Sequence, residues 1–180
     1  IIDANTLKQK NLLQRYPGQD EMGCSLSLAA DQFIIERTID NEATHTILAG
    51  FPWFLDWGRD TFISLPGLCL STGRFDVAWS VLKTFAKAVS EGMIPNRFDD
   101  YGNPPHYNSI DASMWFVHAA FQYLRHAKDA ANFSRQLLPA VKWIMDSYRK
   151  GSRFGIHADD DKLITGGDVN TQLTWMDAKF

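Results

Sequence analysis

Aromatic, amide and charged side chains gather at four points of this chain, and each group lies ahead of a predicted helix or opens it. The groups are Trp53, Trp57, Arg59 and Asp60; Asn96 and Arg97; Tyr107, Asn108 and Asp111; and Trp175, Met176 and Asp177. Tryptophan faces stack on the apolar C–H side of a pyranose ring, and Asp, Asn and Arg side chains bond its hydroxyl groups in pairs. If the helices pack side by side, the four groups meet at one rim and could form a sugar-binding cleft.

Three of these residues carry carboxyl groups that could act on a glycosidic bond, namely Asp60, Asp111 and Asp177. Cleavage needs one protonated carboxylic acid and one ionised carboxylate. Spacing alone does not decide which of the three takes which role. A structural interpretation also stays open, because a carboxylate in the first turn of a helix stabilises the helix dipole, and Trp53 and Trp57 could be core residues.

The other reactive side chains do not form a recognisable site. The five histidines lack the paired spacing of a metal site, and the three aspartates at 159–161 lack the alternate ligand positions of a calcium loop. Cys24 and Cys69 lie far apart in apolar surroundings and are predicted to be reduced core thiols. The sequence therefore predicts neither a metal nor a cofactor.

Apolar residues spaced three and four apart predict five helices that position these groups. Their expected ranges are 25–37, 60–73, 74–92, 111–127 and 132–149, and Pro66 is expected to kink the second helix. Thr44, Thr46 and Ile47 favour extended structure, residues 93–107 form a long loop, and residues 151–171 are rich in turns. Period-two alternation is almost absent, so the predicted class is all-α, built of helical hairpins.

Composition and charge narrow the function further. The 180 residues are 45% hydrophobic and 22% charged, which is typical of a globular protein and excludes a disordered chain. The net charge is −3 without a basic stripe, so nucleic acid is not an expected partner. The most apolar stretch, residues 47–57, is interrupted by Gly50, Pro52 and Asp56, so no membrane span is expected. No signal-peptide pattern opens the chain, and we expect a cytoplasmic location.

Four short motifs resemble, in the same order, the catalytic domain of glycogen debranching enzymes, the amylo-α-1,6-glucosidase part. They are Gly50-Phe51-Pro52-Trp53-Phe54 with Trp57-Gly58-Arg59-Asp60-Thr61; Ile94-Pro95-Asn96; Tyr107-Asn108 with Asp111-Ala112 and Trp115-Phe116; and Thr174-Trp175-Met176-Asp177-Ala178-Lys179. Each motif is weak alone, but four in order across residues 24–180 make a specific resemblance. One small departure, Lys162 where a glycine is expected, falls in a turn.

The resemblance implies an (α/α)6 barrel, related in architecture to the glucoamylases, of which this chain holds only part. Residues 24–180 are then the N-terminal portion of a glycosidase catalytic domain, and the polar residues 1–23 are a leading segment or connector. The implied reaction is inverting hydrolysis of α-1,6-linked glucose at branch points. The implied partner is an α-glucan such as glycogen, limit dextrin or a malto-oligosaccharide. Apolar helix faces that would pack against the rest of the barrel should make the isolated chain aggregation-prone or molten.

The resemblance also implies roles for single residues. Arg59 and Asp60 match the pair that grips the non-reducing glucose, and Asp177 matches the general acid, while the general base lies beyond Phe180. The other residues expected to bind substrate are Trp53, Trp57, Asn96, Arg97, Tyr107, Asn108, Asp111 and Trp175. Two alternatives stay open: another α/α-barrel α-glucosidase of glucoamylase or trehalase type, and a catalytically incomplete carbohydrate-binding helical domain.

Overall fold

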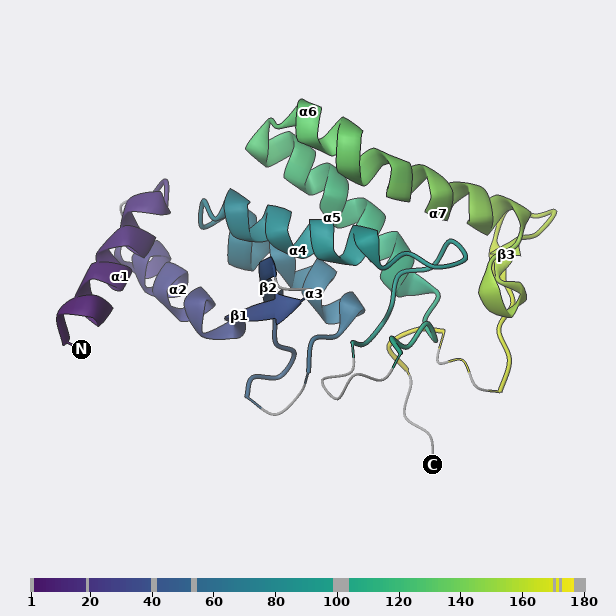
Figure 1. Cartoon of the computed structure of the whole chain (residues 1–180), viewed down its shortest axis with the longest axis horizontal. Coiled ribbons are helices and arrows are strands. Elements are labelled where there is room, and N and C mark those ends of the chain that lie inside the picture. The colour runs from purple at the N-terminus through teal and green to yellow at the C-terminus, as the bar shows by residue number, and fades with distance from the viewer. Residues whose placement is uncertain are drawn as a thin grey trace.

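Helices make up most of the computed structural model, which describes residues 2–18, 20–39, 42–52, 55–98, 104–169, 171 and 173–176. Two short antiparallel hairpins are the sheet structure of the described residues (Figure 1). This confirms the predicted predominance of helix. The barrel implied by the resemblance remains a proposal.

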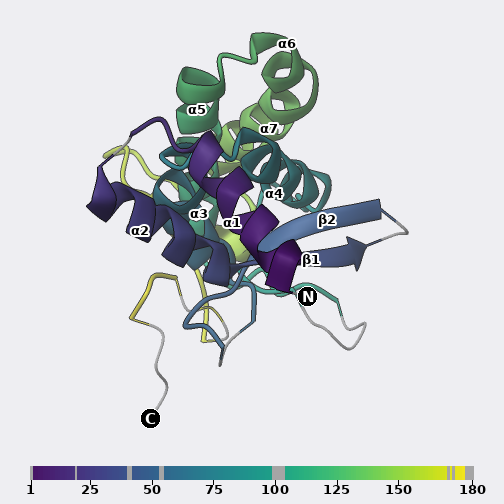
Figure 2. The ribbon, with the colours of Figure 1, turned by 90° about the vertical axis from the view of Figure 1, so that its left-hand side faces the viewer.

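The first part of the chain forms a pair of helices, α1 (Ile2–Arg15) and α2 (Glu21–Ala30). The leading segment is thus largely helical. Helix α2 begins at residue 21 because the Asp20 side chain accepts a hydrogen bond of 2.7 Å from the Gly23 amide, as an N-cap does. The pair lies to one side of the remaining helices (Figures 1 and 2).

The predicted helix over residues 25–37 is wrong in its second half. Helix α2 ends at Ala30, a 3₁₀ turn follows, and residues 34–39 form strand β1 (Ile34–Ile39). The β-branched residues Ile34, Ile35 and Thr38 favour a strand, and their pairing with a second strand outweighs the weak helical spacing. That second strand, β2 (Glu42–Ile47), confirms the extended structure predicted around Thr44 and Thr46.

The β1–β2 hairpin is fixed to the helices by hydroxyl groups. The Thr44 Oγ1 atom lies 2.7 Å from Thr84 Oγ1 and 3.1 Å from Ser80 Oγ, both on helix α4 (Phe75–Lys87). The His45 amide also donates to Ser80 Oγ at 3.0 Å. Strand β2 therefore packs against α4, and β1 pairs with β2 on the side away from α4 (Figure 2).

Helix α3 (Gly58–Leu65) begins close to the predicted position and changes character at Pro66. Residues 66–70 form a π-helical segment in which the Ser71 amide donates to the Pro66 carbonyl at 2.9 Å. Proline has no amide hydrogen for the residue four positions earlier, so the regular helical ladder is broken there. The expected kink takes the form of this wider segment.

The last helices match their predicted ranges well. Helix α5 (Asp111–Ala127) has the predicted bounds, and α6 (Ala130–Asn132), a π-helical segment and α7 (Leu138–Lys150) cover the predicted helix at 132–149. The turn-rich region after α7 contains a small hairpin, β3 (His157–Ala158) with β4 (Ile164–Thr165).

Three phenylalanine rings join α3, α4 and α5 at the centre of the core. Phe62 packs edge-on against Phe85 and Phe116, with ring centroids 4.8 Å and 5.3 Å apart, and all three residues are buried. This packing sets α3 and α5 against each other. The loops that precede both helices gather below the helical layer in Figure 1, together with the segment that ends at residue 176.

The two cysteines differ in environment. Cys69 is fully buried, and burial raises the pKa of its thiol to about 12, so the thiol stays protonated. Cys24 is only partly buried, and both are free thiols. The prediction of a reduced core thiol is confirmed for Cys69 and holds only in part for Cys24.

Candidate active site

An arginine–aspartate pair joins the first turns of α3 and α5. The Arg59 Nε atom donates to both carboxylate oxygens of Asp111, at 2.8 Å to Oδ2 and 3.0 Å to Oδ1. The Arg59 side chain is 7% exposed and that of Asp111 is 23% exposed. Arg59 thus lies inside the molecule, and the carboxylate that it holds reaches the surface.

Two further contacts fix the start of α5. The buried Ser109 hydroxyl donates to Asp111 Oδ1 at 2.5 Å and accepts from Arg59 Nη2 at 3.1 Å. From α7, the Tyr148 hydroxyl donates to the Ile110 carbonyl at 2.6 Å. Burial raises the pKa of Tyr148 to about 12, so this hydroxyl remains a donor throughout the neutral range. The position of Asp111 is therefore set from two directions.

The second group lies beside the first through backbone contacts. The Gly58 amide donates to the Asn96 carbonyl at 2.8 Å, and bridges connect Trp57 with Arg97 and Arg97 with His106. The Arg97 guanidinium carbon lies 5.7 Å from the centre of the Trp57 ring. Its Nη2 atom lies 2.9 Å from His106 Nε2, and because arginine can only donate, this histidine nitrogen must accept.

The structure places the predicted binding residues at different depths. Asn96 is fully buried, and no partner is found among the described residues for its side-chain amide. In this conformation, therefore, Asn96 contributes through its backbone rather than its side chain. The Tyr107 hydroxyl donates to the Ala88 carbonyl at 2.7 Å, and the Arg153 guanidinium lies over its ring at 4.7 Å, while Asn108 is partly buried.

The fourth group reaches the same rim. The Leu173 carbonyl accepts the Ile110 amide at 2.9 Å and the Asp111 amide at 3.4 Å, which brings residues 173–176 to the start of α5. Trp175 and Met176 are 72% and 74% exposed. Two predicted residues, Trp53 and Asp177, lie outside the described residues. The backbone of the first three groups, and Leu173 just before the fourth, thus meet where α3 and α5 begin.

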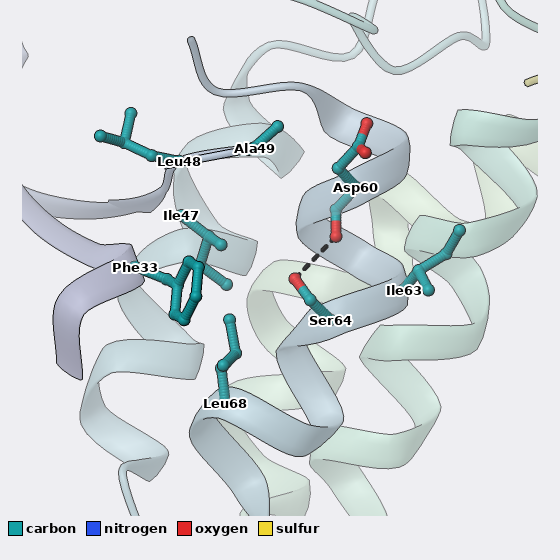
Figure 3. A pocket seen from close by; sticks show the side chains of 9 residues that line it. Phe33, Ile47, Leu48, Ala49, Asp60, Ile63, Ser64 and Leu68 are labelled. Atoms are coloured by element: carbon teal, nitrogen blue, oxygen red, sulfur yellow. Dashed lines mark hydrogen bonds between the residues drawn. The ribbon is translucent and has the colours of Figure 1, made fainter. Parts of the chain in front are cut away.

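Asp60 lies on another face of α3 than Arg59, because successive helical residues are rotated by about 100°. It is exposed and lines a pocket of about 380 Å³ between α3 and the end of the hairpin (Figure 3). The pocket is otherwise mainly apolar and is formed by Phe33, Ile47, Leu48, Ala49, Gly50, Asp60, Ile63, Ser64 and Leu68. The Ser64 hydroxyl donates to the Asp60 carbonyl at 2.7 Å. The two residues of the Arg-Asp motif therefore face different surroundings.

Asp56 was not recognised as a site residue from the sequence. Its side chain is 2% exposed and pairs with Arg37 Nη1 at 2.7 Å, and the Thr46 hydroxyl donates to it at 3.0 Å. These contacts tie both strands of the hairpin to the residue before Trp57. The signal in the sequence was an aspartate within an aromatic run. An aspartate is buried in such surroundings only when a partner balances its charge.

We expect Gly58→Ala to disturb the junction between the first two groups. A Cβ atom there would lie 2.5 Å from the Pro95 carbonyl oxygen, so backbone must shift. The free energy of unfolding should fall by about 1–3 kcal/mol, the usual cost of overpacking. Gly67→Ala is the matched control, because a Cβ at Gly67 meets nothing within 4 Å. Urea unfolding that is unchanged in Gly58→Ala would contradict the tight contact.

The described residues contain neither a metal-binding cluster nor a membrane-spanning helix. Among them, no group of three or more His, Cys, Asp or Glu side chains is placed to hold a metal ion. Over the same residues, no helix is both long and apolar enough to cross a bilayer.

Residues 28–180 match the family model described as amylo-alpha-1,6-glucosidase, and the chain belongs to this family. Over 152 residues it is 37% identical to the glycogen debranching enzyme of Saccharomyces cerevisiae, a match that covers 79% of this chain and 10% of that enzyme. The chain thus spans about a tenth of the length of this relative.

Proposed function

We propose that this chain is the N-terminal portion of an (α/α)6-barrel glycosidase domain that hydrolyses α-1,6-linked glucose at branch points of glycogen or limit dextrin. The single observation that carries the proposal, for a chain of this family, is the Arg59–Asp111 pair that joins α3 to α5, with Leu173 bound to the start of α5. A cytoplasmic location and an α-glucan partner belong to the same proposal. No cofactor is needed, because two carboxyl groups suffice for glycoside hydrolysis.

The partly exposed side chains of the rim suit a sugar ring. Trp57 and Trp175 offer aromatic faces, and Trp53 has the same role in the proposal. Asp111 accepts hydrogen bonds from sugar hydroxyls, as an ionised carboxylate does, and Asp60 would accept them from the separate pocket that it lines. Arg59 supports this role from inside the molecule, since its guanidinium is bound to Asp111.

The chemical step assigned to this portion of the domain is protonation of the leaving oxygen by Asp177. Inverting enzymes hold the acid and the base about 6.5–9.5 Å apart, which leaves room for a water molecule on the opposite face of the sugar. The base is assigned to sequence beyond Phe180. The 180-residue chain, which lacks that base, should therefore release no glucose.

A substrate panel tests the proposal. The full-length enzyme that contains this domain is offered limit dextrin and α-1,4-, α-1,6- and α,α-1,1-linked glucosides, and released glucose is measured. Preference for α-1,6 linkages supports the proposal, and preference for either other linkage points to a glucoamylase or trehalase relative.

The 180-residue chain is measured in parallel, by the same release assay and by calorimetry with maltose and isomaltose. Glucose release by this chain would refute the placement of the base beyond Phe180. Sugar binding by the full-length enzyme without release from any glucoside would indicate a carbohydrate-binding domain instead.

A further inference from the structure

We propose that Ser109 is a positioning residue that fixes the carboxylate of Asp111 for sugar binding, a role that rests on the proposed function of the site. Ser109 belongs to none of the motifs that mark the family resemblance. It is fully buried and stands directly before the first turn of α5.

All the hydrogen-bonding capacity of the Ser109 hydroxyl is used. Its single proton goes to Asp111 Oδ1 at 2.5 Å, and its oxygen accepts from Arg59 Nη2 at 3.1 Å and from the Ala112 amide at 3.3 Å. A hydroxyl has one donor and two acceptor positions. Ser109 thus connects the guanidinium of α3, the carboxylate of α5 and the α5 backbone in one cluster.

In this cluster the two carboxylate oxygens of Asp111 accept different numbers of hydrogen bonds. Oδ1 accepts from both Ser109 and Arg59, whereas Oδ2 accepts only from Arg59 Nε among these groups. A carboxylate oxygen can accept two hydrogen bonds, and this side chain is 23% exposed. Oδ2 is therefore the oxygen that can take a sugar hydroxyl, and the Ser109 donation selects it by occupying the other.

Helix capping alone would be a simpler role for Ser109. A cap needs only an acceptor for the Ala112 amide, whereas positioning Asp111 also needs the donated proton. Thermal stability and sugar affinity separate the two functions, because loss of a cap lowers the Tm, whereas loss of the donated proton also weakens sugar binding. Threonine retains both functions, and alanine removes both.

The test uses the full-length enzyme with Ser109→Ala and Ser109→Thr. KM and kcat for glucose release from limit dextrin, the Kd for maltose and the Tm are measured for each. Ser109→Ala should raise KM and Kd about tenfold or more, the range of a lost hydrogen bond to a charged group, with a smaller change in kcat. Ser109→Thr should restore values near wild type.

A cap elsewhere supplies the matched control. Asp129 caps α6 by accepting the Asn132 amide at 3.2 Å, and it stands outside the candidate site. Asp129→Ala should lower the Tm without changing KM or Kd. Wild-type KM and Kd in Ser109→Ala would overturn the proposal and leave Ser109 as a cap only.

The outcomes also distinguish this proposal from the proposed function. If the wild-type enzyme binds maltose but releases no glucose, the proposed reaction fails. The positioning role is then judged on the maltose Kd of the same variants. An enzyme that binds no sugar at all would overturn both proposals.

Discussion

Replacing Asp177 with asparagine is expected to abolish glucose release from limit dextrin by the full-length enzyme while leaving sugar binding nearly unchanged. An amide cannot give a proton to the leaving oxygen, and general acid catalysis contributes on the order of 10²–10⁴-fold to rate. The loss should appear in kcat rather than in the Kd for maltose. Released glucose and calorimetry on the same preparation measure both quantities.

Asp146→Asn is the matched control for that substitution. Asp146 lies exposed on α7 and belongs to none of the four groups. The same change from carboxylate to amide there should leave kcat and Kd unchanged. Turnover by Asp177→Asn at the wild-type rate would remove Asp177 from the role of acid.

The second large effect is expected from Arg59→Met, which keeps the side-chain volume but removes the guanidinium. The Asp111 carboxylate would then lose its main partner in a partly buried site. Breaking a buried ion pair costs about 3–5 kcal/mol. The 23% exposure of Asp111 lets water compensate in part, so we expect the lower end of that range. Urea unfolding measures the loss, and the KM for limit dextrin should rise as well.

Two variants control for the loss of a positive charge. Arg59→Lys keeps the charge but not the fork that bonds Asp111 and Ser109 together, so it should recover stability only in part. Arg15→Ala breaks the Arg15–Asp76 pair, whose side chains are 44% and 62% exposed, and should cost less than about 1 kcal/mol. Equal costs for Arg59→Met and Arg15→Ala would contradict a special role for the Arg59–Asp111 pair.

The elements that could be predicted from sequence are those with a long, regular apolar period and clear end signals. Helix α5 was predicted with its observed bounds, because its apolar residues repeat over several turns. The helix predicted over residues 34–37 was wrong, because their apolar spacing is compatible with a short helix as well as a strand. The partner strand, which decides between them, lies after the turn.

The segments that form the candidate site could be predicted from the sequence, but the contacts between them could not. Each group stands at a loop-to-helix junction, and that pattern predicted a common rim. The pairing of Arg59 with Asp111 joins residues far apart in sequence, and it depends on how Phe62 packs against Phe116. Local patterns carry no information on such pairing.

The burial of each side chain could not be predicted from the sequence either. The Asn96 side chain is fully buried, although its place in a polar loop before a helix predicted a sugar-binding role. The contacts of Ser109 and Asp56 were not predicted at all. A serine or a single aspartate beside a helix is too common to predict a role until its partners in the fold are known.

The measurement that tests the central claim most directly is the anomeric form of the first glucose released from limit dextrin. Proton NMR of the full-length enzyme's reaction distinguishes the two anomers before they equilibrate. An inverting α-1,6-glucosidase must release β-glucose first. Initial release of α-glucose would contradict the account, because it requires a covalent intermediate and closer carboxyl groups than an inverting site has.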